Sequence, residues 1–130
     1  MKLLFALIPV VFASQVLACA PGEGALSMSA ETQTDMAAFL TLGPQSLSQP
    51  FDLTLLFCGE KADTLTAVDV SAAMPAHQHG MNYEPRVAQV GDGEFTVSGM
   101  LFHMPGDWRI EVEARTEEKP LYFTLDVAAQ

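Results

Sequence analysis

The chain has few basic residues. Six lysines and arginines stand against sixteen aspartates and glutamates, which gives a formal net charge of −10 at pH 7. A nucleic-acid partner needs a basic patch that neutralises phosphates, so this shortage argues against one. An acidic surface keeps a protein soluble and raises the local concentration of cations.

Helical patterning and enzyme motifs are also missing. Beyond the N-terminal segment, no amphipathic stretch of ten or more residues appears, and neither does an internal repeat. The sequence holds no nucleophile motif and no glycine-rich phosphate-binding loop. Glu84 is the one candidate general base, and it reads more simply as part of the acidic surface. We therefore expect a protein without helices that is not an enzyme.

The long apolar run of the chain is confined to its start. Lys2 precedes the run Leu3–Val11, which only Pro9 interrupts, and small residues follow at Ala18 and Ala20. This pattern is typical of a secretory signal peptide and is too short to span a bilayer. We expect residues 1–18 to be removed, leaving a periplasmic or secreted chain without a transmembrane helix. Cleavage after Ala20 fits the pattern as well.

Cysteine is scarce, with Cys19 and Cys58 as the two examples. In an oxidising compartment such a pair indicates one disulfide. Cys19 follows Val16-Leu17-Ala18, so acylation of Cys19 and a lipid anchor form an alternative. Cys58 would then be a buried small hydrophobe or a metal-binding thiolate. The sequence leaves these alternatives open.

Short apolar alternations separated by turn residues dominate the rest of the chain. Their spacing predicts an antiparallel immunoglobulin-like β-sandwich of about seven strands in a domain spanning residues 36–128. Residues 19–35 have little apolar content and predict a flexible leader. The predicted strands are Met36–Leu42, Phe51–Cys58, Leu65–Val70, Arg86–Val90, Phe95–Phe102, Trp108–Arg115 and Leu121–Val127.

Soft metal ligands gather in two segments. His77, His79 and Met81 are spaced two residues apart, so in an extended strand all three side chains would share one face; in an irregular loop the spacing guarantees nothing. His103 lies in the second segment. Imidazole suits copper and zinc, and thioether favours Cu(I). The residues therefore predict a metal site formed by His77, His79, Met81 and His103.

Strict alternation from Phe95 would bury His103 and expose Phe102. A β-bulge at Gly99 would reverse this register, sending Phe102 inward and His103 outward. We expect the bulge. Met74, Met100 and Met104 are expected to be core filler, and Trp108 is expected to be the central core aromatic. Each histidine taken singly is also compatible with a solvated loop residue.

These residues resemble the YtkA-like domain family and, more loosely, FixH-like proteins. The resemblance spans about residues 36–127 and implies an exported immunoglobulin-like sandwich linked to copper handling or to oxidase assembly. It points to His77, His79, Met81 and His103. We expect a copper-binding protein that holds one Cu(I) or Cu(II) ion; the alternative is a metal-free sandwich that binds a periplasmic or membrane protein partner. The motifs that carry the resemblance are Met74-Pro75-x-His77-x-His79-Gly80-Met81, Gly93-x-Phe95 and Gly99-Met100-x-Phe102-x-Met104-x-Gly106-x-Trp108.

Overall fold

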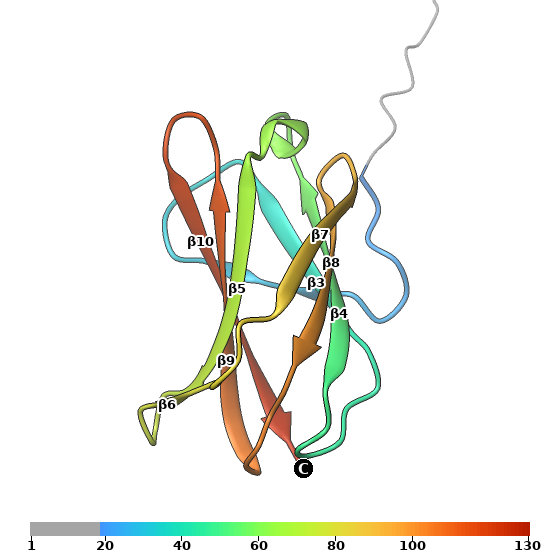
Figure 1. Ribbon diagram of the computed structural model, residues 1–130. Coiled ribbons are helices and arrows are strands. Elements are labelled where there is room, and N and C mark those ends of the chain that lie inside the picture. The colour runs from blue at the N-terminus through green and yellow to red at the C-terminus, as the bar shows by residue number, and fades with distance from the viewer. Residues whose placement is uncertain (1–18) are drawn as a thin grey trace, which may run out of the picture.

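The computed structural model describes residues 19–130, so the predicted signal peptide lies outside the described residues. Two antiparallel sheets of five strands pack face to face as a β-sandwich (Figure 1). Within residues 19–130, no helix has the length and apolar character needed to cross a bilayer.

The first sheet has the strand order β1-β3-β4-β8-β7, and the second has the order β2-β10-β9-β5-β6. A single turn of 3₁₀ helix, η1 (Ala62–Thr64), precedes β5. The strands are β1 (Leu26–Ser27), β2 (Ser29–Ala30), β3 (Ala37–Leu42), β4 (Phe51–Cys58), β5 (Ala67–Met74), β6 (His79–Gly80), β7 (Arg86–Gly91), β8 (Glu94–Met100), β9 (Gly106–Arg115) and β10 (Pro120–Ala129).

The seven longer strands correspond to the seven predicted from the sequence. Counted along the chain, strands one, two, five and four form one sheet, and seven, six and three form the other. This order is that of a constant-type immunoglobulin domain, so the predicted fold class is confirmed. Strand β5 runs past Val70 to Met74 because Ala72 and Met74 also face the core.

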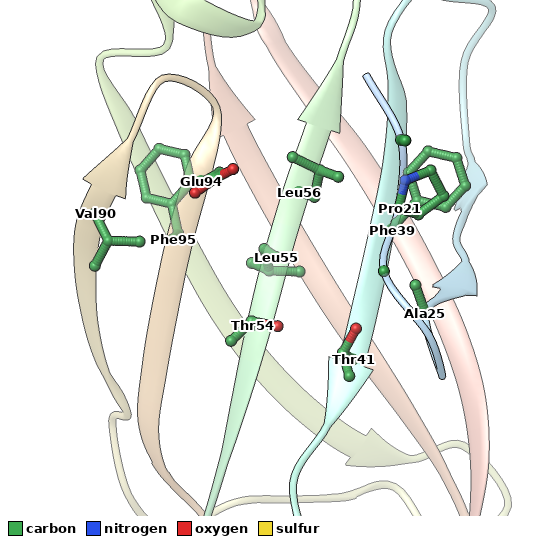
Figure 2. A pocket seen from close by; sticks show the side chains of 12 residues that line it. Pro21, Ala25, Phe39, Thr41, Thr54, Leu55, Leu56, Val90, Glu94 and Phe95 are labelled. Carbon is green, nitrogen blue, oxygen red and sulfur yellow. The ribbon is translucent and has the colours of Figure 1, made fainter. Parts of the chain in front are cut away.

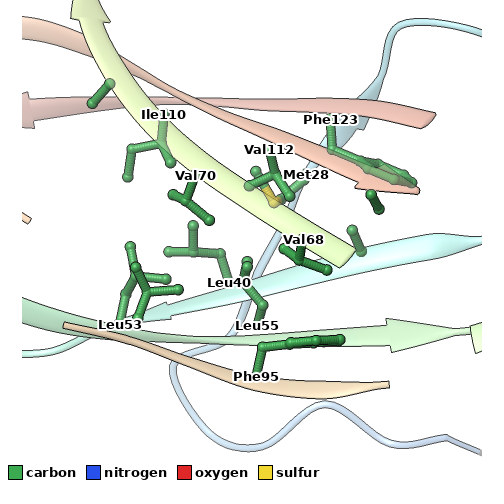
Figure 3. Close-up of a cluster of buried hydrophobic side chains, with 14 of the residues drawn as sticks. Met28, Leu40, Leu53, Leu55, Val68, Val70, Phe95, Ile110, Val112 and Phe123 are labelled. Atoms are coloured by element: carbon green, nitrogen blue, oxygen red, sulfur yellow. The ribbon is translucent and has the colours of Figure 1, made fainter. Parts of the chain in front are cut away.

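One hydrophobic core fills the space between the sheets (Figure 3). Alternate residues of β4, β5, β8 and β9 are buried, as a strand with one solvated face requires. Trp108 is completely buried, and its indole stacks on Phe102, with ring centroids 5.0 Å apart. Phe102 in turn lies 4.8 Å from Phe51. Trp108 is therefore a central core aromatic, as predicted.

The segment predicted as a flexible leader is instead part of the sandwich. Its strands β1 and β2 pair with β3 and β10, so the segment extends both sheets. Met28 lies between them, is 7% exposed, and donates its N–H to the carbonyl of Ala38 at 2.9 Å. The buried side chain of Met28 and a few backbone hydrogen bonds hold β1 and β2 in place, although the composition of this segment did not predict strands.

Cys19 and Cys58 form a disulfide, with Cα atoms 5.6 Å apart. The alternatives of a buried thiol or a thiolate ligand at Cys58 therefore do not hold in this structure. The arm of residues 19–25 crosses the outer face of the first sheet before it enters β1. The backbone hydrogen bond found for residues 20–25 within the described chain joins Ala25 N–H to the Gly22 carbonyl, inside the arm.

The predicted bulge at Gly99 is confirmed. Phe51 pairs with Met100 while Leu53 pairs with Val97, so β8 carries one more residue than β4 at this point. Gly99 has φ +85°, a left-handed conformation that glycine adopts without steric cost. Phe102 is consequently 2% exposed, whereas the side chain of His103 points to solvent.

Candidate metal site on the His77–Met81 hairpin

His77 and His79 lie on a tight hairpin that joins β5 to β6. Pro75 occupies the second position of a β-turn, in which His77 N–H donates to the Met74 carbonyl at 3.1 Å. Proline favours this position because its ring fixes φ near −65°. Gln78 follows with φ +52°, and this left-handed residue turns the chain back along β5. His77 therefore lies in a turn, while His79 begins the extended return strand.

The return strand places His79 and Met81 on the same side of the sheet. His79 pairs with Met74, and the N–H of Met81 donates to the Ala72 carbonyl at 3.0 Å. Met74 and Ala72 both face the core, and paired residues project to the same face. His79 is nevertheless exposed, whereas Met81 is half-buried against the core.

The two hairpin imidazoles lie close together. Their ring centroids are 6.4 Å apart, and the ring planes differ by 27°. Both side chains are exposed, so they turn about their side-chain bonds with little loss of packing. Two imidazoles that can face one ion, on the same hairpin as the thioether of Met81, form a donor set suited to copper.

His103 lies on the loop between β8 and β9, at the same end of the sandwich as the hairpin (Figure 1). Its imidazole packs edge-on against Trp108, with ring centroids 5.2 Å apart and planes at 78°. The indole N–H of Trp108 donates to the Met104 carbonyl at 3.0 Å, which fixes this loop against the core. Among residues 19–130, no group of three or more His, Cys, Asp or Glu side chains is placed to hold a metal ion.

The methionines are mostly core residues, as predicted. Met74 is 1% exposed and Met100 is fully buried, while Met104 is half-buried against the core. Met74 connects the hairpin with the His103 loop: it pairs with His79, and a Cβ on Gly106 would lie 2.8 Å from its Cε. The methyl group of Met74 thus packs over Gly106.

Sequence reasoning missed two features of this region. The left-handed conformation of Gln78 had no signal, since neither glycine nor asparagine stands at that position. The contact between His103 and Trp108 requires the bulge at Gly99 and the turn before β9 together. The bulge was predicted, but its effect on neighbouring side chains needs the three-dimensional arrangement.

A groove of about 310 Å³ lies elsewhere, on the outer face of the first sheet (Figure 2). Phe39, Thr54 and Leu56 line its floor, and Pro21 of the N-terminal arm and Val90 lie at its margins. Its lining includes no histidine, methionine or cysteine, so it is separate from the candidate metal site.

No family model, curated protein or solved structure matches this chain. Its function is therefore inferred from its own residues.

Proposed function

We propose that this chain is an exported copper-binding protein that holds or delivers one copper ion on the His77–Met81 hairpin. The observation that carries the proposal is the pair of exposed imidazoles with centroids 6.4 Å apart. Imidazole and thioether together favour copper over hard cations such as Mg²⁺ and Ca²⁺, which prefer oxygen. Membership of the YtkA-like family is part of the same proposal, and the immunoglobulin-like strand order agrees with it.

The disulfide supports the exported location. Disulfides persist in oxidising compartments and are rare in reducing ones. The bond also supports removal of residues 1–18 rather than 1–20, because cleavage after Ala20 would discard Cys19. A lipid anchor on Cys19 would need the sulfur that here bonds Cys58, so we propose the soluble periplasmic or secreted form.

A metal-free role in binding a protein partner is the second candidate. The observation in its favour is Tyr83, which is 61% exposed and follows the hairpin directly. Exposed aromatic side chains are enriched in protein interfaces. In this role His77 and His79 would contact the partner rather than an ion.

Titration of residues 19–130 with Cu(I) and with Cu(II) separates the two candidates. The matched variant is His77→Ala/His79→Ala, which removes both imidazoles from exposed positions and leaves the core unchanged. If the copper function is correct, each wild-type chain binds one copper ion and the variant binds copper with lower affinity. Equal, weak binding by both proteins would exclude the copper function and leave the partner-binding role.

A further inference from the structure

We infer that the hairpin selects Cu(I), bound between His77 and His79 with Met81 as a third ligand, and that His103 stays outside the coordination sphere. This inference rests on the proposed copper function and deepens it: it names the oxidation state of the ion and reduces the predicted set of four ligands to three.

The two imidazoles lie close enough together to share one ion. A metal–nitrogen bond of about 2.0–2.1 Å places the centroid of an imidazole about 3.2 Å from the ion. Two imidazoles on opposite sides of one ion then have centroids about 6.4 Å apart, against about 5.2 Å at a tetrahedral angle. The separation in the structure is 6.4 Å. This separation leaves both rings within reach of one ion at either angle, once the exposed side chains rotate so that a nitrogen of each ring faces the ion.

The number of donors on the hairpin also favours Cu(I). A closed-shell monovalent ion is satisfied by two or three soft ligands, whereas Zn²⁺ takes four in a tetrahedron and Cu(II) takes a tetragonal set of nitrogen and oxygen ligands. Two imidazoles and one thioether are enough ligands for Cu(I). They are too few for the tetrahedral set of Zn²⁺ and lack the oxygen and nitrogen ligands of a tetragonal Cu(II) site. Met81 lies on the same side of the strand as His79, and its burial against the core limits its motion.

His103 has a different environment. Its ring packs against Trp108 with the two planes at 78°, and its loop is fixed by the indole hydrogen bond to the Met104 carbonyl. The aromatic neighbour of His103 is therefore Trp108, whereas His77 and His79 neighbour each other. His77 and His79 instead project from the same hairpin. The set of His77, His79 and Met81 is therefore local to residues 77–81.

Gln78 positions the two imidazoles relative to each other. Its φ of +52° sets the bend between them, and non-glycine residues adopt such a conformation rarely. Glycine keeps this conformation accessible, whereas a β-branched residue disfavours it. Gln78→Gly and Gln78→Val therefore form a matched pair that tests the bend without touching a ligand.

The experiment measures Cu(I) affinity by competition with a chromophoric Cu(I) chelator, and Cu(II) and Zn(II) affinity by calorimetry. We expect one Cu(I) per chain, bound more than about a hundredfold more tightly than either divalent ion, which corresponds to about 2.7 kcal/mol. Met81→Leu lowers Cu(I) affinity by about tenfold or more and leaves Cu(II) affinity unchanged. His103→Ala leaves Cu(I) affinity unchanged, and Gln78→Val lowers it more than Gln78→Gly. X-ray absorption of the Cu(I) form shows two nitrogen ligands and one sulfur ligand.

Three other results would each contradict a specific part of the proposal. Tight Cu(II) binding with a tetragonal electron paramagnetic resonance spectrum would overturn the selectivity and leave the copper function standing. A loss of Cu(I) affinity in His103→Ala as large as that in the double histidine variant would overturn the three-ligand set. Binding of neither copper ion would overturn both the proposed function and this inference. Circular dichroism of each variant confirms that it is folded.

Discussion

The imidazole of His103 lies edge-on to the indole of Trp108, with ring centroids 5.2 Å apart. Trp108 is the one tryptophan of the chain, so its fluorescence reports directly on this contact. Because the indole is fully buried and its N–H is hydrogen-bonded, its emission is also sensitive to the packing of the core.

The first prediction concerns this contact. His103→Ala removes the edge of one ring from the face of another, an interaction of about 0.5–1.5 kcal/mol for well-packed aromatic pairs. Because His103 is exposed, we expect a loss of unfolding free energy at the lower end of this range and a change in Trp108 emission intensity. Urea unfolding and fluorescence spectra measure the two effects. His79→Ala is the control, and an equal change in emission there would contradict the assignment.

The second prediction concerns the bulge. Gly99→Ala forces a side chain onto a residue with φ +85°, although nothing lies within 4 Å of the added Cβ. The expected loss of stability is about 1–2 kcal/mol, the cost of a left-handed conformation for an L-residue. Gly22→Ala is a matched control, since its Cβ also meets open space and its φ is not left-handed. Equal stabilities of the two variants would show that the bulge is not strained by a side chain.

The third prediction concerns the disulfide. It closes a loop with a sequence separation of 39, for which chain-entropy arguments give about 4 kcal/mol. Without the bond, the arm regains motion in the native state. We therefore expect the free energy of unfolding to fall by about 2–4 kcal/mol in the variant Cys19→Ser/Cys58→Ser. Hydrogen exchange should rise at Ala25, whose N–H makes the hydrogen bond within the arm, and stay slow in β4 and β9. Rapid exchange throughout β4 would mean that the bond holds the sheet as well as the arm.

The fourth prediction concerns acid stability. A hydrogen bond from Arg109 lowers the pKa of Asp126 below its ordinary value of 3.8. A lowered folded-state pKa contributes stability above the unfolded-state pKa, and this contribution is lost as pH falls through the folded-state value. Asp126→Asn should therefore flatten the fall in stability below about pH 4. Denaturant melts across this range measure the slope.

Arg109→Gln is the matched variant for that pair, because it removes the donor and keeps the carboxylate. It should flatten the slope in the same way. Added salt should reduce the difference from wild type, since both side chains are largely exposed and exposed charges are screened. A slope identical to wild type in both variants would show that the ion pair does not contribute in solution.

The strands were predictable where burial alternates strictly. In β9 the apolar series that begins at Trp108 is interleaved with charged residues, and one face must therefore meet the core. The Gly99 bulge was predictable for the same reason: strict alternation there would have buried His103 and exposed Phe102. In both cases the hydrophobic pattern alone decides which face of the strand points inward.

Other features depend on contacts between distant residues. Strands β1 and β2 have two residues each and rest mainly on backbone hydrogen bonds, which any composition can form. The sequence offered the Cys19–Cys58 bond as one alternative, because residue types alone give no distance between them. For the histidines, the sequence gives their spacing along the chain but not their arrangement in space. The arrangement depends on the bend at Gln78, and a glutamine at that position does not indicate a bend.

Strand β6 also has a protective role. The unpaired edge of a sheet is a template for pairing with another chain, and His79–Gly80 occupies that edge beside the last residues of β5. The loop that carries the proposed ligands therefore also covers the edge of the sheet at the end of β5. Deleting it to abolish metal binding would expose the backbone of Ala73 and Met74. Point substitutions at His77 and His79 keep this shield in place, and aggregation of a loop-deleted chain would reveal what the shield prevents.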